Sequence, residues 1–207
     1  MDILTNPTHP KPEAALQGFR HIRRFWDAPR ERFVAKILPG QYYVTKNTEA
    51  IATILGSCIS VCIRDPSVGI GGMNHFLLPG SNAASVHDEI IEQKPCARYG
   101  IHAMDMLIKD LIYHGAERRN LEVKVTGGGK VISASSDVGE HNIAFVREYL
   151  AMKQLPVHAE DVGDCFPRKV LYFPDTGRLL IKKLRDTPSD HVRRREDKFL
   201  HKIECSE

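Results

Sequence analysis

The residues best suited to chemistry are a cysteine and a histidine, Cys58 and His75, separated by 75 − 58 = 17 positions. Cys58 follows a Gly-Ser corner between two apolar runs, where backbone N–H groups can point into the space beside the side chain. A thiol there can have a lowered pKa when such donors or a histidine are close. The alternative is that Cys58 is a small core residue, as cysteines in apolar stretches often are.

A hairpin between the two residues would bring their side chains together. The turn signal Asp65-Pro66-Ser67 falls near the middle of the intervening segment. Strands that follow one another in the sequence usually pair, so Cys58 and His75 should lie side by side at one sheet edge. That is the arrangement of a thiolate–imidazole nucleophile pair. Cys62, by contrast, falls mid-strand, and its spacing from Cys58 does not match the Cys-x-x-Cys of zinc or redox sites.

The elements that must position this pair follow from the hydrophobic patterning. Two amphipathic helices are predicted over residues 99–114 and 139–153, the first with a glycine stop at Gly115. Strands are expected over residues 33–38, 42–45, 50–55, 59–63, 68–76, 121–126, 157–159, 169–173 and 179–184, the last two as a hairpin. This order predicts an α+β (mixed α/β) single domain, with β-sheets flanked by two main helices.

Charge and composition divide the chain into three parts. Residues 1–32 read as an N-terminal extension outside the core, 33–184 as the domain, and 185–207 as a charged, solvated C-terminal tail. The net charge of +3 is carried by residues 1–36, with seven basic and four acidic side chains, and the rest of the chain is neutral. A neutral body argues against a nucleic-acid-binding core, which would present a basic face.

Other classes of protein are excluded by simple patterns. No apolar run approaches the ~20 residues of a membrane span, and the N-terminus lacks the basic start and apolar stretch of a signal peptide. The five cysteines are odd in number and irregularly spaced, which argues against a disulfide framework. We therefore expect a reduced, cytoplasmic protein without membrane insertion. The remaining histidines form no metal-spaced pair on a common helix face, so no zinc site is expected.

Two segments around the candidate pair carry a family resemblance. Leu55-Gly56-Ser57-Cys58, followed by Gly72-Met73-Asn74-His75-Phe76-Leu77-Leu78-Pro79, closely resembles the signature of CheD, the bacterial chemoreceptor glutamine deamidases. Supporting matches are Arg98-Tyr99-Gly100, Gly115-Ala116, Gly127-Gly128-Gly129, Gly139, Asn142, Ala159-Glu160-Asp161, Gly163 and Arg168. The resemblance covers about residues 33–184 and implies a CheD-like cysteine hydrolase fold.

The resemblance also implies a catalytic set, with Cys58 as the nucleophile, His75 as the base and a threonine as the third member. In the family this threonine stands six residues before the cysteine, where this chain has Ala52, and Thr53 is the next residue. A shift of one residue along a strand turns a side chain to the opposite face. Thr53 is thus the candidate if a small bulge at the glycine corner restores its direction, and Ser57 is a second hydroxyl nearby.

The implied function is hydrolytic deamidation of specific glutamine side chains to glutamate on methyl-accepting chemotaxis receptors, which tunes chemotaxis signalling. Such a protein-glutamine glutaminase would need no metal or organic cofactor. The implied partners are the cytoplasmic helices of these receptors and, in some relatives, a CheC-type phosphatase. One alternative is a non-catalytic adaptor that binds a receptor helix or the phosphatase, and another is a cysteine hydrolase acting on a different amide or ester.

Overall fold

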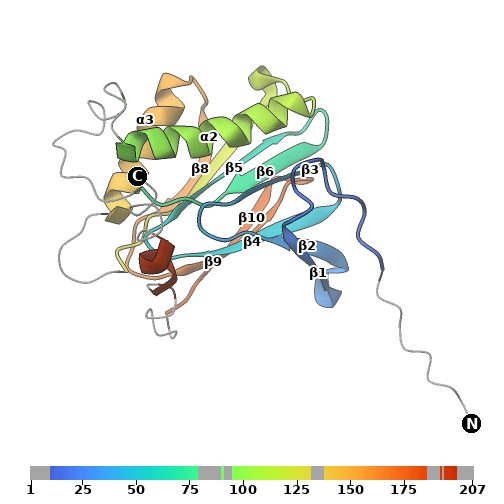
Figure 1. The fold of residues 1–207 in the computed structure, drawn as a ribbon, viewed down its shortest axis with the longest axis horizontal. Coiled ribbons are helices and arrows are strands. Elements are labelled where there is room, and N and C mark those ends of the chain that lie inside the picture. The colour runs from blue at the N-terminus through green and yellow to red at the C-terminus, as the bar shows by residue number, and fades with distance from the viewer. Residues whose placement is uncertain are drawn as a thin grey trace, which may run out of the picture.

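Two five-stranded β-sheets and two main helices form three layers (Figure 1). The computed structural model describes residues 10–78, 90, 95–131, 138–185, 192 and 194–199. One sheet has the order β1-β2-β4-β9-β10. Its strands are β1 (Arg23–Asp27), β2 (Arg32–Lys36), β4 (Glu49–Leu55), β9 (Arg168–Phe173) and β10 (Arg178–Lys183). The other sheet has the order β3-β6-β5-β7-β8. Its strands are β3 (Tyr42–Thr45), β6 (Ile70–Asn74), β5 (Ile59–Asp65), β7 (Glu122–Gly127) and β8 (Val157–Val162).

The helices α2 (Pro95–Tyr113) and α3 (Val138–Met152) cover the sheet that contains β5, and the sheet that contains β4 lies on the other side (Figure 1). Two short 3₁₀ helices, η1 (Ala28–Arg30) and η2 (Arg118–Asn120), complete the named elements. The central sheet is thus covered on both faces, which explains why residues 59–63 are apolar or small without alternation and are all buried. The predicted mixed α/β class with two main helices is confirmed.

The hairpin predicted between the two candidate residues is present. β5 and β6 pair antiparallel, with Cys62 opposite Met73, and an isolated bridge joins Ile59 to Phe76 at the open end. Cys58 immediately precedes the first strand, and His75 immediately follows the second. The hairpin therefore brings the two residues together at the open end of the paired strands, as the position of the turn indicated.

The N-terminal segment contributes more to the core than its sequence suggested. β1 pairs antiparallel with β2 and forms the edge of its sheet, while Phe19 and Ile22 are buried in the core. Within the predicted N-terminal extension, residues 19–27 thus pack on the domain. Its arginines hid the strand, because charged side chains are common on edge strands, where they oppose association with another sheet.

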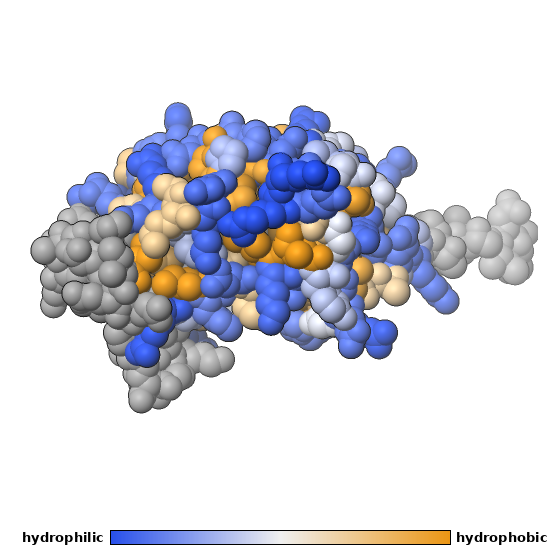
Figure 2. Space-filling view, turned by 90° about the horizontal axis from the view of Figure 1, so that it is seen from above, coloured by the Kyte–Doolittle hydropathy of each residue, from blue (hydrophilic) through white to orange (hydrophobic). Residues whose placement is uncertain are grey.

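The outer face of the helical layer is mainly hydrophilic, with smaller hydrophobic areas between the polar side chains (Figure 2). Exposed apolar side chains on the helices include Tyr113 and Met152. Within the described parts of the chain, no helix is long and apolar enough to cross a membrane.

Candidate active site

The corner that carries Cys58 is held from behind by a glycine turn. Gly128 N–H donates to the Cys58 carbonyl (2.8 Å), and Gly129 N–H donates to the Gly56 carbonyl (2.9 Å). Gly127 has φ +122°, and a Cβ there would lie 2.3 Å from the Cys58 carbonyl oxygen, so only glycine allows this approach. The run of three glycines is therefore a tight turn that orients the corner.

With its carbonyls bound in this way, the corner turns its N–H groups to one point, where they hold the carboxylate of Glu196. Glu196 Oε1 accepts from Gly56 N–H (2.8 Å) and Cys58 N–H (3.1 Å). Its Oε2 accepts from both the N–H and the hydroxyl of Ser57 (2.9 and 2.7 Å). Three convergent N–H groups form an anion-binding nest of the kind that stabilises an oxyanion.

Glu196 lies in the segment that was predicted to be a solvated tail, so its place in the site was not expected. Its side chain is 1% exposed, and residues 194–199 around it are helical. In the sequence, Glu196 and Asp197 directly follow Arg193-Arg194-Arg195, a charge pattern typical of a solvated segment. Nothing in the sequence shows that one of these carboxylates reaches back about 140 residues to the nest.

His75 is oriented by Thr53. The Thr53 hydroxyl lies 2.7 Å from His75 Nδ1 and donates to the Ile37 carbonyl at 3.0 Å. Because the carbonyl can only accept, both contacts are satisfied when Nδ1–H donates to the threonine oxygen. This assigns the tautomer: Nδ1 carries the proton, and Nε2 presents a lone pair.

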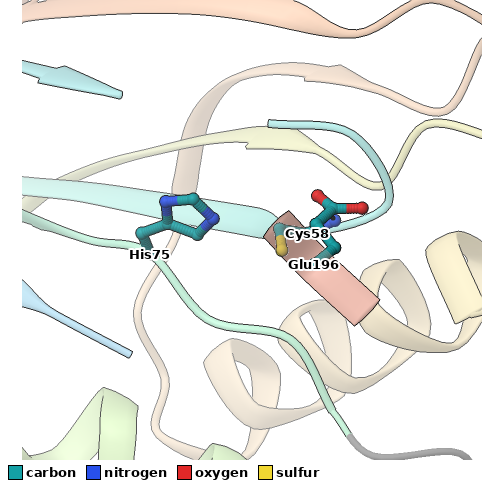
Figure 3. A group of neighbouring side chains, drawn as sticks. All are labelled: Cys58, His75 and Glu196. Carbon is teal, nitrogen blue, oxygen red and sulfur yellow. Dashed lines mark hydrogen bonds between the residues drawn. The ribbon is translucent and has the colours of Figure 1, made fainter. Parts of the chain in front are cut away.

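The free lone pair faces Cys58. The ring nitrogen remote from the histidine backbone points toward the sulfur, and Glu196 lies on the far side of it (Figure 3). One donor atom each from Cys58, His75 and Glu196 fall within 4.8 Å of one another, and all three residues are buried. No group of the described residues hydrogen-bonds Nε2, which leaves it available to take the thiol proton.

Burial sets the protonation states of this pair. Burial, and then the neighbouring Glu196 carboxylate, raise the pKa of the Cys58 thiol well above its ordinary value. Burial, and then the positive charge of Arg195, lower the pKa of His75 to about 3. With Glu196 in the nest, the pair is a neutral thiol beside a neutral imidazole rather than a preformed ion pair.

Thr53 reaches His75 without the bulge that the sequence comparison required. β4 pairs with β9 in regular register through Thr53 opposite Val170. Ala52 packs instead on the opposite face, against the cluster of Val34, Ala50 and Phe173. The structure therefore brings Thr53 to the pair, while the Ser57 hydroxyl binds Glu196.

Asn142 on α3 joins the two halves of the site. Its Nδ2 donates to the Ser57 carbonyl (2.9 Å), and its Oδ1 accepts from Leu78 N–H (2.9 Å). The amide thus ties the corner before β5 to the segment after His75. Its side chain is completely buried, so water cannot replace these bonds.

Replacing this amide should destabilise the domain. Asn142→Ala leaves a buried N–H and a buried carbonyl without partners, at about 1–3 kcal/mol each. We expect the free energy of unfolding in urea to fall by about 2–4 kcal/mol. Asn120→Ala, which removes one exposed bond to Ser67, is the control and should cost below about 1 kcal/mol. Equal small losses in both variants would contradict the bridging role.

Among the described residues, Cys58, His75 and Glu196 form the group whose donors could hold a metal ion. Both Glu196 oxygens, however, already accept hydrogen bonds from the corner. The donors around this carboxylate are those of an anion site, and a metal would have to replace them.

The domain is mixed α/β, and its buried cysteine faces a histidine that is oriented by a threonine and lies beside convergent backbone N–H groups. These features fit the class of cysteine-dependent hydrolases. Comparison with known proteins narrows this class. The family described as CheD chemotactic sensory transduction matches residues 77–183. A relative from Halorhodospira halophila, named probable chemoreceptor glutamine deamidase CheD, is 47% identical over 189 residues, 91% of this chain and 88% of its own. A relative of the same name from Hahella chejuensis is 45% identical over 192 residues, 93% of this chain and 90% of its own.

The chain belongs to the CheD family. The family predicted from the two segments around Cys58 and His75 is therefore confirmed.

Proposed function

We propose that this protein is a chemoreceptor glutamine deamidase, an amide hydrolase that converts glutamine side chains of chemotaxis receptors to glutamate. Cys58 is the nucleophile, His75 the general base and acid, and Thr53 the residue that orients His75. The observation that carries the proposal is the carboxylate of a glutamate side chain bound beside Cys58 by three backbone N–H groups. The product of glutamine deamidation carries this same group. The names of the two relatives support the choice of receptor glutamines as substrate.

The first half of the reaction forms a thioester and releases ammonia. The substrate carboxamide takes the place of the Glu196 carboxylate, with its oxygen in the nest. His75 Nε2 accepts the thiol proton as Cys58 Sγ attacks the amide carbon, and the resulting oxyanion is stabilised by the corner N–H groups. The imidazolium then protonates the amide nitrogen, the C–N bond breaks, and ammonia leaves.

The second half hydrolyses the thioester. His75, neutral again, takes a proton from water as the oxygen attacks the thioester carbon. The same N–H groups hold the second oxyanion. The C–S bond then breaks and His75 returns the proton to the sulfur. The product carboxylic acid loses its remaining proton to solvent, and the glutamate carboxylate is left in the nest.

The cytoplasmic helices of methyl-accepting receptors are the proposed partners, which places the protein's work in the cytoplasm. Each conversion adds a negative charge to a packed helical bundle and weakens its packing by like-charge repulsion. A CheC-type phosphatase is a further candidate partner, inferred from the family resemblance alone.

Thr53 gives a test of the orienting role. Thr53→Val removes the hydroxyl while keeping the shape of the side chain, and frees His75 to adopt the wrong tautomer. The deamidation rate should fall by about tenfold or more, and Thr53→Ser should restore most of it. Unchanged rates in Thr53→Val, measured by ammonia release, would show that the hydroxyl has no part in the reaction.

The function itself is tested by incubating the protein with a receptor cytoplasmic fragment. Mass spectrometry of the fragment's peptides should find glutamines that gain about one dalton, as the exchange of NH₂ for OH requires. Binding of the fragment without any mass shift would favour the adaptor. Hydrolysis of small amides or esters, with the receptor fragment left unchanged, would favour a different cysteine hydrolase.

A further inference from the structure

We propose that the nest is a binding site for the chain's own C-terminal helix, residues 194–199, which inserts Glu196 as an analogue of the product glutamate and thereby closes the active site. The likeness of Glu196 to the product, and the release of the helix by a receptor, rest on the proposed function. That the helix covers Cys58 is independent of the substrate.

The first anchor is the carboxylate itself. Three N–H groups and one hydroxyl of the corner bind its two oxygens, at 2.7 to 3.1 Å. Hydrogen bonds to a charged acceptor are stronger than neutral ones. Because the N–H groups that should stabilise the oxyanion are all used, a substrate carbonyl cannot enter until Glu196 leaves.

The second anchor is Phe199, three residues further along and therefore on the same side of the helix. Its ring lies against Gly40, where an added Cβ would be 2.6 Å from a ring carbon, and its centroid is 6.3 Å from that of Tyr99. Gly40 and Tyr99 also line a cavity of about 110 Å³ whose wall includes His75.

The two faces of the helix differ in exposure, as expected of a segment that docks on the domain. Glu196 is buried and Phe199 partly buried, whereas Arg194, Arg195 and Lys198 are exposed. The helix thus presents a carboxylate and an aromatic ring, spaced i and i+3, to the corner and the cavity wall. A substrate helix that offers a glutamine followed by an apolar residue three positions later would occupy the same surface.

Closure of the site by the helix also explains why Cys58 is inaccessible to solvent. Cys58 is fully buried, so neither a receptor helix nor a small reagent reaches the sulfur in this arrangement. The helix must leave, and a receptor helix that competes for the nest and the Gly40–Tyr99 surface would release it. The protein would then be active mainly where receptor is concentrated.

Alkylation of the full-length protein with iodoacetamide tests the closure without any deamidation assay. The modified cysteines are followed by mass spectrometry, with exposed Cys165 as the internal reference. Glu196→Ala should raise the alkylation rate of Cys58 at least about tenfold relative to Cys165, since it removes every contact of the carboxylate. Phe199→Ala should raise it in the same direction, and Lys198→Ala, on the exposed face, should leave it unchanged.

Three results would overturn the proposal. The first is equal alkylation of Cys58 in the wild type and in Glu196→Ala. The second is joint alkylation of Cys58 and the core residue Cys62, which would make Glu196 a structural lock of the fold. The third is slower receptor deamidation by Glu196→Ala than by the wild type, which would make Glu196 part of the catalytic machinery. Faster alkylation of Cys58 without receptor deamidation in any variant would uphold the closure and refute the deamidase.

Discussion

Cys58→Ala is expected to abolish receptor deamidation, with a loss of about four orders of magnitude or more, because no thioester can form. The fold should persist. Cys58 already lies in a tight apolar environment, and exchanging the sulfur for a hydrogen removes only one buried atom. Circular dichroism and urea unfolding check the fold, and ammonia release with a receptor fragment checks the activity.

Cys62→Ala is the matched control for this variant. Cys62 is also completely buried, but it lies within β5, where it pairs with Met73 and Lys124. The Cys62→Ala variant should keep the wild-type deamidation rate, while its free energy of unfolding should fall by about as much as that of Cys58→Ala. Full activity in Cys58→Ala, or equal losses in the two variants, would remove the thiol mechanism from consideration.

His75→Ala should lower the deamidation rate by about 10²–10⁴-fold, the usual contribution of a general base and acid. The base is lost directly, because Nε2 is the ring atom that faces the sulfur. The fold should again persist, and His158→Ala, at an exposed strand position, serves as the control. A His75→Ala variant with the wild-type rate would mean that the thiol loses its proton to another group.

The buried imidazole of His75 also makes the free energy of unfolding depend on pH. Burial and Arg195 hold its folded-state pKa near 3, below the unfolded value of about 6.5. The unfolded chain therefore binds more protons between these values, so the stability contributed by the neutral ring is present above pH ~6.5 and is lost as the pH falls toward 3. Thr53 hydrogen-bonds the ring, Cys58 and Glu196 have donor atoms within 4.8 Å of a ring nitrogen, and Tyr99 and His102 line the same cavity. Urea unfolding across this range should show a shallower pH dependence in His75→Ala.

The sequence predicted the part of the site that depends on local pairing. The turn at Asp65-Pro66-Ser67 made a β5–β6 hairpin the simplest topology, and the hairpin alone places Cys58 beside His75. The glycine run was part of the family resemblance, and the structure shows it holding the corner. These contacts involve strands that are neighbours in the sheet, which hydrophobic patterning and turn residues specify well.

Long-range contacts were the part that the sequence could not predict. Thr53 was uncertain because its distance from Cys58 differs from the family pattern, whereas in the structure the regular β4–β9 register turns Thr53 to the His75 side and Ala52 away. Glu196 was missed because one acidic residue among many charges gives no signal of burial. The division of the chain into extension, domain and tail stays a prediction. Glu196, from the tail, is part of the site, and β1, from the extension, is part of a sheet.

Deamidation in ¹⁸O-labelled water decides whether Cys58 hydrolyses glutamine side chains of receptors. A receptor cytoplasmic fragment is incubated with the wild type, Glu196→Ala and Cys58→Ala, and its peptides are mapped by tandem mass spectrometry. We expect defined glutamines to be converted to glutamate with one ¹⁸O from water, faster with Glu196→Ala and not at all with Cys58→Ala. A fragment that binds the protein, but whose glutamines remain unlabelled with both the wild type and Glu196→Ala, would contradict this role of Cys58.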